Sequence, residues 1–208
     1  MNIFVSRPTW ISSEFEEGLD AFLLTLKNMG LIPRTLGASD YPSKAPLDEV
    51  IEIMDECKGA IVLGYPQISV ISGTVKDEPL NSPLILPTEW NHIEAALAYS
   101  KGLPLMILHH LEVSRGVFDR GVMNAFVHQV NLTKQNWCLD STLNGAMTKW
   151  KENCISGNAN FGLKTTGKRD QPICPNCSTN SKPIYLSKLS VPFNEFGDWI
   201  CSRCDYSE

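Results

Sequence analysis

Apolar residues follow two alternating patterns along most of the chain: short uninterrupted runs and stripes with helical spacing. The runs predict strands at Asn2–Ser6, 31–36, 59–64 and 103–108, and a further strand at Phe126–Val130. The stripes predict helices at 14–29, 46–57, 88–101 and 141–154. Pro33 within the second run indicates an edge strand, because proline cannot donate a hydrogen bond to a neighbouring strand.

Strands and helices therefore alternate, which is typical of an α/β domain built on a mostly parallel sheet. The short links favour a flavodoxin-like sheet of about five strands in the order 2-1-3-4-5, flanked by helices. We assign residues 1–155 to this domain. Residues 156–172 form a linker rich in Gly, Asn, Thr and Lys, and residues 173–208 form a small separate unit.

The small unit contains two CxxC pairs, Cys174 with Cys177 and Cys201 with Cys204, separated by 23 residues. Four thiolates at this spacing predict a zinc ribbon that holds one tetrahedral Zn²⁺ ion. Because every ligand position is a cysteine, no position is open to a substrate, and the zinc is expected to be structural. Ribbons bind protein or nucleic acid. Five basic residues between 164 and 188 suit phosphate contacts, although a solvated linker face is the simpler interpretation.

Amino-acid composition excludes some classes of protein but does not indicate a function. Hydrophobic residues make up 43% of the chain and charged residues 20%, as in an ordinary globular protein. The net charge of -5 argues against a nucleic-acid surface over the whole chain. The N-terminal pattern is not that of a signal peptide, and no apolar stretch is long enough to span a membrane. We therefore expect a cytoplasmic protein.

The helix predicted at 88–101 carries the most unusual residue of the chain. Thr88 is placed to cap its N-terminus, and Gly102 to end it. Glu94 shares a helical stripe with large apolar residues, among them Trp90. Since burial of an unpaired carboxylate is costly, Glu94 must reach water through a cleft or meet a partner. Glu94 is therefore the first candidate for a catalytic group.

In an open parallel sheet, ligands bind beyond the carboxyl ends of the strands, where the strand order reverses. The residues that follow the first and third predicted strands are therefore candidates for binding: Ser6, Arg7, Tyr65 and Gln67. The Glu94 helix starts from the same edge. A rim of Arg, Tyr, Trp and Glu suits a small planar or sugar-containing ligand.

Two further segments belong to this edge. Residues 65–87 lack clear periodicity, and a loop this long predicts a lid or specificity loop. His109 and His110 close the fourth strand at this edge, and we expect adjacent histidines at a strand end to be polar loop residues rather than metal ligands.

The block around Glu94 resembles a known family. Trp90, Glu94, Ala95–Ala98 and Lys101–Pro104 resemble the W-x-x-x-E…A…GK-x-(P) block of enzymatic Toll/interleukin-1 receptor (TIR) domains. Nucleoside 2-deoxyribosyltransferases, which share a related fold, carry a similar E-x-G-x-A…GK block. The resemblance covers roughly residues 1–135 and implies the parallel sheet predicted above.

The resemblance implies that Glu94 acts on a ribose whose N-glycosidic bond is cleaved, in a pocket lined by Ser6 and Arg7. It makes Trp90 and Tyr65 candidate stacking surfaces. Loss of a base from C1′ develops an oxocarbenium ion, which an adjacent carboxylate can stabilise or trap. With NAD, nicotinamide leaves neutral from a cationic precursor, so no strong general acid is needed. By analogy with bacterial members, the resemblance implies antiphage defence or signalling through a linear, cyclic or modified ADP-ribose.

Two departures from these families keep alternatives open. Residues 65–87 are longer than the usual TIR connection, and Gly64–Gln67 replace the Asp-containing motif of the deoxyribosyltransferases. NAD or a related nucleotide is therefore preferred over a deoxynucleoside. The alternatives are a non-catalytic nucleotide-sensing or adaptor module acting through a protein partner or a second copy, a deoxyribosyltransferase-like enzyme, and a nucleic-acid-associated protein that works through its ribbon.

Overall fold

The chain divides into two units, Met1–Gly162 and Leu163–Glu208, which are described separately. The computed structural model describes residues 1–41, 43–119, 121–123 and 125–157 of the first unit, and 187–188 and 199–200 of the second. In the second unit, β10 (Ser187–Lys188) pairs antiparallel with β11 (Trp199–Ile200). The cysteines predicted to bind zinc, Cys174, Cys177, Cys201 and Cys204, lie outside the described residues, so the zinc site stays a prediction.

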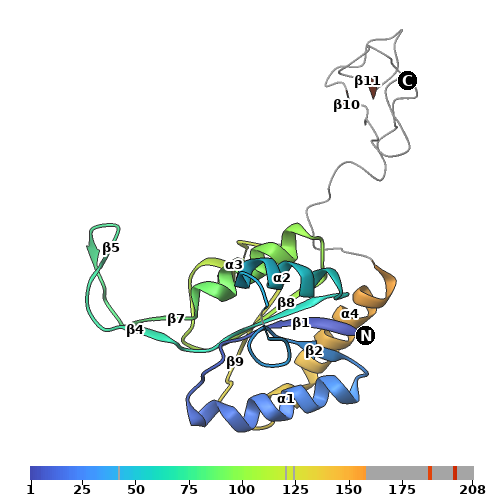
Figure 1. The fold of residues 1–208 in the computed structure, drawn as a ribbon. Helices are drawn as coiled ribbons and strands as arrows, with labels where there is room; N and C mark the ends of the chain where they lie inside the picture. The colour runs from blue at the N-terminus through green and yellow to red at the C-terminus, as the bar shows by residue number, and fades with distance from the viewer. Residues whose placement is uncertain (42, 120, 124, 158–186, 189–198, 201–208) are drawn as a thin grey trace. The chain divides into compact units, whose positions relative to one another are not determined.

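The first unit is built on a five-stranded parallel sheet (Figure 1). Its strands are β1 (Asn2–Ser6), β2 (Ile32–Arg34), β3 (Ala60–Gly64), β8 (Leu105–His110) and β9 (Phe126–Val130). Their order, β2-β1-β3-β8-β9, confirms the flavodoxin-like arrangement predicted from the sequence. β2 lies at the edge, as Pro33 indicated.

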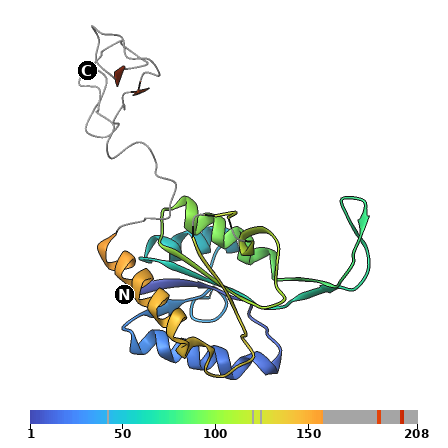
Figure 2. The ribbon, with the colours of Figure 1, turned by 180° about the vertical axis from the view of Figure 1, so that it is seen from behind.

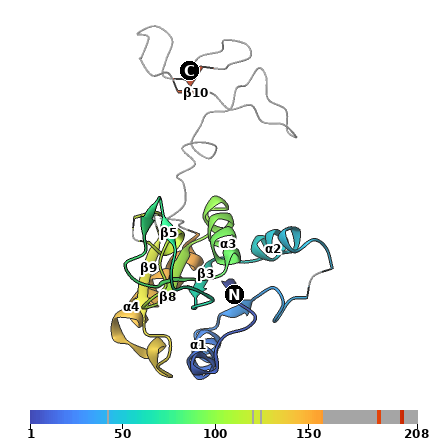
Figure 3. The ribbon, with the colours of Figure 1, turned by 90° about the vertical axis from the view of Figure 1, so that its left-hand side faces the viewer.

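Helices cover both faces of the sheet. Among the described residues these are α1 (Glu16–Asn28), α2 (Pro46–Asp55), α3 (Glu89–Ser100) and α4 (Ser141–Ser156), with short 3-10 turns η1 (Ser13–Phe15), η2 (Gly116–Phe118) and η3 (Trp137–Leu139). α1 and α4 lie on one face, and α2 and α3 lie on the other (Figure 1, Figure 3). No helix in the described part of the chain is both long and apolar enough to cross a membrane.

Alternate residues of the central strands point to opposite faces of the sheet and pack in two separate hydrophobic cores. Ile3 and Val5 of β1 pack in the core with α1 and α4, whereas Phe4 packs in the core with α2 and α3. β3 and β8 divide their residues in the same way. Because both faces of the sheet are covered, these strands are apolar at nearly every position, which explains the uninterrupted runs in the sequence.

Residues 65–87 are more regular than the sequence indicated. β4 (Ile68–Val70) pairs antiparallel with β7 (Leu84–Leu86), and β5 (Thr74–Val75) pairs with β6 (Glu78–Pro79). Residues 68–86 thus form a hairpin arm that projects from the domain (Figure 1, Figure 2). Lys76 and Asp77 close its tip with φ angles of 53° and 66°, as a tight hairpin turn requires. These strands have only two or three residues, too few to show a period.

His109 and His110 close the fourth strand of the chain's parallel sheet, as expected, but the expectation that they are polar loop residues is wrong. Both residues belong to β8, where they pair with Gln129 and Val130 of β9. Both are buried, and the His110 ring meets Phe15 edge-on with 5.1 Å between ring centroids. Pairing with β9 continues the strand past Leu108, which the sequence run alone could not show.

Candidate functional site

The start of α3 sets the geometry of the site. The Thr88 hydroxyl accepts a hydrogen bond from the Asn91 backbone N–H at 3.2 Å, which confirms Thr88 as the N-cap. The buried residues of the helix are Asn91, Glu94, Ala95 and Ala98. Trp90, in contrast, is 41% exposed. The buried stripe therefore begins one residue later than the apolar pattern predicted.

Asn91 can be buried because each polar atom of its side chain has a partner. The Thr88 hydroxyl donates to Asn91 Oδ1 at 2.9 Å. Asn91 Nδ2 donates to Ser6 Oγ at 2.8 Å and to the Leu63 carbonyl at 3.4 Å. These bonds tie the first turn of α3 to the carboxyl ends of β1 and β3. Satisfied buried networks of this kind hold side chains in fixed positions.

Glu94 lies one helical turn beyond Asn91 and is 8% exposed. Burial raises the pKa of Glu94 to about 7, and a hydrogen bond with the Ser6 side chain partly opposes this rise. Since Ser6 Oγ accepts from Asn91, its own hydroxyl proton is left to donate to the Glu94 carboxylate. Near neutral pH, Glu94 is therefore divided between its acid and carboxylate forms.

Glu94 lines a cavity of about 380 Å³ at the carboxyl ends of β1 and β3. Its other walls come from the β1–α1 loop, the β2–α2 segment, the residues after β3 and the start of α3. The lining residues are Arg7, Pro8, Thr9, Trp10, Leu36, Gly37, Pro46, Gln67, Thr88, Trp90 and Glu94. Among these residues Glu94 is the only acid and Arg7 the only base. We call this space the Glu94 cavity.

The structure brings together four of the six residues predicted around the ligand. Arg7, Gln67, Trp90 and Glu94 line the Glu94 cavity. Ser6 is 1% exposed and does not line it, so its contact is with Glu94 and Asn91 rather than with a ligand.

Tyr65 lies in the core with α1 and α4, fully buried, and its ring meets Phe15 edge-on. The ring therefore offers no exposed face for stacking. Its hydroxyl has no hydrogen-bond partner among the described residues, and burial raises the pKa of Tyr65.

Arg7 occupies an unusual position for a cation. Its Nη1 donates to the Pro8 carbonyl at 3.3 Å, while its buried Nε has no partner in the described part of the chain. Burial lowers the pKa of Arg7, which Tyr65 and Asp20 partly oppose. Even a lowered arginine pKa leaves the group charged at neutral pH. Arg7 therefore presents a positive charge, with donor capacity to spare, to the Glu94 cavity.

Sequence reasoning missed two residues of the site. Trp10 is 68% exposed and lines the Glu94 cavity, in the loop directly after β1. A tryptophan four residues beyond a strand end at the binding edge was the available signal. Asn91 was missed because its partner Ser6 lies 85 residues away in the sequence, and only that hydrogen bond explains its burial.

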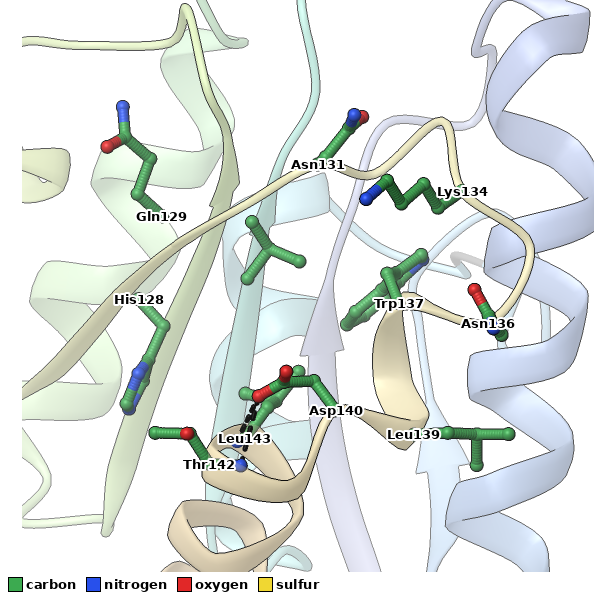
Figure 4. A pocket seen from close by; sticks show the side chains of 11 residues that line it. His128, Gln129, Asn131, Lys134, Asn136, Trp137, Leu139, Asp140, Thr142 and Leu143 are labelled. Carbon is green, nitrogen blue, oxygen red and sulfur yellow. Dashed lines mark hydrogen bonds between the residues drawn. The ribbon is translucent and has the colours of Figure 1, made fainter.

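A larger cavity, of about 500 Å³, lies beside β9 and the start of α4 (Figure 4). Its acid, Asp140, is the N-cap of α4 and accepts hydrogen bonds from the Thr142 and Leu143 N–H groups at 3.0 and 3.1 Å. The described residues that line this β9 cavity include no buried carboxylate and none of the site residues predicted from the sequence. In the described residues, no three His, Cys, Asp or Glu side chains gather as metal ligands.

Comparison with solved structures finds proteins of similar fold. No family model matches the chain, and no curated protein matches it. The fold is similar to that of a CMP N-glycosidase from Clostridium botulinum, BcmB, with a TM-score of 0.45 and 13% sequence identity. The match covers 72% of this chain and 99% of that chain. At this level of likeness, function has to be argued from the geometry of the site itself.

Proposed function

We propose that the first unit is an N-glycosidase that cleaves the bond between ribose C1′ and the base of NAD or a related nucleotide, with Glu94 as the catalytic residue. The observation that carries this proposal is one buried carboxylate, with a pKa of about 7, in the wall of a cavity that has no other acid among its described lining residues. Perturbed carboxylates in clefts are typical of catalytic groups.

The reaction requires little from other acids. The C1′–N bond breaks, its electron pair leaves with nicotinamide, and positive charge develops on the ribose as an oxocarbenium ion. The Glu94 carboxylate stabilises this ion or traps it as an ester. Water then adds at C1′, and the proton it loses passes through Glu94 to solvent. The products of hydrolysis are nicotinamide, ADP-ribose and one proton.

The other residues supply binding and orientation. Arg7 is the cation available to a phosphate group. Trp90 and Trp10, both exposed at the cavity, offer aromatic faces to a base. Ser6 donates a hydrogen bond to the Glu94 carboxyl, and Asn91 in turn donates to Ser6, so together they fix the position of the carboxyl.

Nicotinamide release from NAD, followed by chromatography, tests the proposal. We expect Glu94→Gln to abolish release, because an amide cannot stabilise or trap the cation. Glu89→Gln, an exposed glutamate in the first turn of the same helix, is the matched control and should keep full activity. Release by Glu94→Gln at the wild-type rate would refute the role of Glu94. Nucleotide binding without turnover by the wild type would instead favour a sensing module.

For the second unit we propose a structural Zn²⁺ ion held by Cys174, Cys177, Cys201 and Cys204. Support comes from the spacing of the two CxxC pairs alone. Elemental analysis of the purified chain should find about one zinc per molecule. Replacing Cys174 and Cys177 by serine should remove the metal, whereas Cys57→Ser, at a buried free thiol of the first unit, should not. A metal-free wild-type chain would refute the site.

A further inference from the structure

A second cavity, of about 420 Å³, adjoins the Glu94 cavity. The two share Trp10 and Gln67 as lining residues, so they are neighbours along the carboxyl edge of the sheet. Each is close to the lower limit of roughly 300–1,000 Å³ for small-ligand sites. One nucleoside fits such a volume, and two adjoining cavities suit a ligand with two parts. We call this space the His110 cavity, after the buried histidine in its wall.

His110 gives this cavity a fixed hydrogen-bond donor. Its Nδ1 accepts from the Leu132 backbone N–H at 3.3 Å, so the ring proton is on Nε2. The edge-on contact with Phe15 and 8% exposure hold the ring in this orientation. Nε2 has no hydrogen-bond partner among the described residues, which leaves its N–H for a ligand. Burial lowers the pKa of His110, which the charges of Glu112 and Glu14 partly oppose.

The two cavities differ in charge: carboxylates line the His110 cavity, and an arginine lines the Glu94 cavity. The His110 cavity is lined by Glu14 and Glu112, and none of its described lining residues is Arg or Lys. These acids disfavour a phosphate there, and their oxygens accept hydrogen bonds from hydroxyl or amino groups. Arg7, in the Glu94 cavity, is the cation for phosphates. The His110 cavity therefore suits an uncharged hydroxylated or amino-bearing group that approaches from a phosphate near Arg7.

We propose that the His110 cavity is a second subsite of the glycosidase and takes a nucleoside, so that the preferred substrate is a dinucleotide whose linking phosphates lie near Arg7. The base of this second nucleoside has the rings of Trp10 and Phe15 beside it, and its ribose has the carboxylates of Glu14 and Glu112. This inference rests on the proposed N-glycosidase activity. It adds to that activity a choice between dinucleotide and mononucleotide.

Substrate length separates the subsite from the chemistry. NAD and nicotinamide mononucleotide present the same bond to Glu94, but only NAD has a second nucleoside. Ser69→Trp fills the His110 cavity from an exposed position of β4. Ser72→Trp is the matched control, since Ser72 is exposed on the hairpin arm and lines neither cavity.

We expect Ser69→Trp to lower kcat/KM for NAD by about tenfold or more, equivalent to about 1.4 kcal/mol of lost binding, and to leave nicotinamide mononucleotide unchanged. Glu112→Gln should raise KM for NAD alone by a few-fold. Ser72→Trp should leave kcat/KM unchanged for both substrates. Equal effects of Ser69→Trp on both substrates, or none on either, would overturn the second subsite while leaving the role of Glu94 intact.

If neither substrate is cleaved by the wild type, the proposed glycosidase fails, and calorimetry with the same two ligands still decides the subsite. Weaker binding of NAD to Ser69→Trp than to the wild type, with mononucleotide binding unchanged, would support it. Equal binding of NAD to both proteins, or no binding at all, would overturn it.

Discussion

Two acids at the carboxyl edge of the sheet show how placement decides what a carboxylate can do. Asp140, in the β9 cavity, is exposed and accepts two backbone N–H bonds as the N-cap of α4. Glu94, in the second turn of α3, is buried, and its hydrogen bond is to the Ser6 hydroxyl. Asp140, in the larger β9 cavity, therefore serves to cap a helix. Glu94, in the smaller Glu94 cavity, is available for chemistry.

The difference has an energetic side. Backbone donors and solvent stabilise an ionised carboxylate, so a capping acid contributes to folding. Burial disfavours the charged form, so Glu94 costs stability once it ionises. Active sites commonly hold groups that the fold would be more stable without.

The largest expected effect is a gain of stability on removing the charge of Glu94. The pKa of this group rises from an ordinary 4.5 to about 7 on folding. The unfolded chain therefore loses the proton before the native one, and wild-type stability falls as pH rises from 4.5 to 7. Above pH 7, Glu94→Gln should be more stable by about 3 kcal/mol. Below pH 4.5 the two should be equal. Urea unfolding at pH 4, 6 and 8 measures the gap, and a gap independent of pH would contradict it.

The second prediction concerns activity. If the carboxylate form of Glu94 supports the oxocarbenium ion, kcat/KM for NAD should rise with pH and level off above about 7. Below pH 7 it should fall by about tenfold for each pH unit, since only the ionised fraction is active. Initial rates between pH 5 and 9 measure this profile. A fall above pH 7 would show that protonated Glu94 is needed, as for a base that must be protonated to leave.

The third prediction concerns Asn91, a positioning residue. Asn91→Ala leaves the Leu63 carbonyl and the Ser6 hydroxyl without their donor, which should cost about 1–3 kcal/mol of folding free energy. It should also lower kcat more than it raises KM, and move the midpoint of the pH profile, because Ser6 is freed from Asn91. Asn144→Ala, at an exposed asparagine of α4, is the matched control. An unchanged pH midpoint would reduce Asn91 to a structural role.

The smallest effect is expected at the contrasting acid. Asp140→Ala removes the N-cap of α4 and should destabilise the domain by about 1 kcal/mol, without altering nicotinamide release. Asp140→Asn should lose less, because asparagine caps almost as well. Thermal unfolding and the NAD assay measure both. If either variant is fully folded but has lost activity, the result would indicate that the reaction takes place in the β9 cavity.

Local pattern was enough for much of the fold. The five central strands, the four helices, the edge position of Pro33 and the N-cap at Thr88 all follow from residue spacing and from the limits that proline and hydroxyl side chains impose. Pattern was also enough to single out Glu94, since an acid in an apolar stripe is an inconsistency that needs a partner or a cleft. The hairpin arm was missed, because strands of two or three residues show no period.

The tertiary structure decided which residues meet. It buried Tyr65 in the core, placed Trp10 and Trp90 in the wall of the same cavity, and placed the Asn91 amide against Ser6 from a distant strand. None of these contacts can be predicted from the spacing of residues along the chain, because residues far apart in the sequence meet only when the sheet assembles. Residue spacing alone indicated that Glu94 is out of place in the apolar stripe of its helix. Only the packing of α3 against β1 and β3 determined its burial, its pKa and the cavity before it.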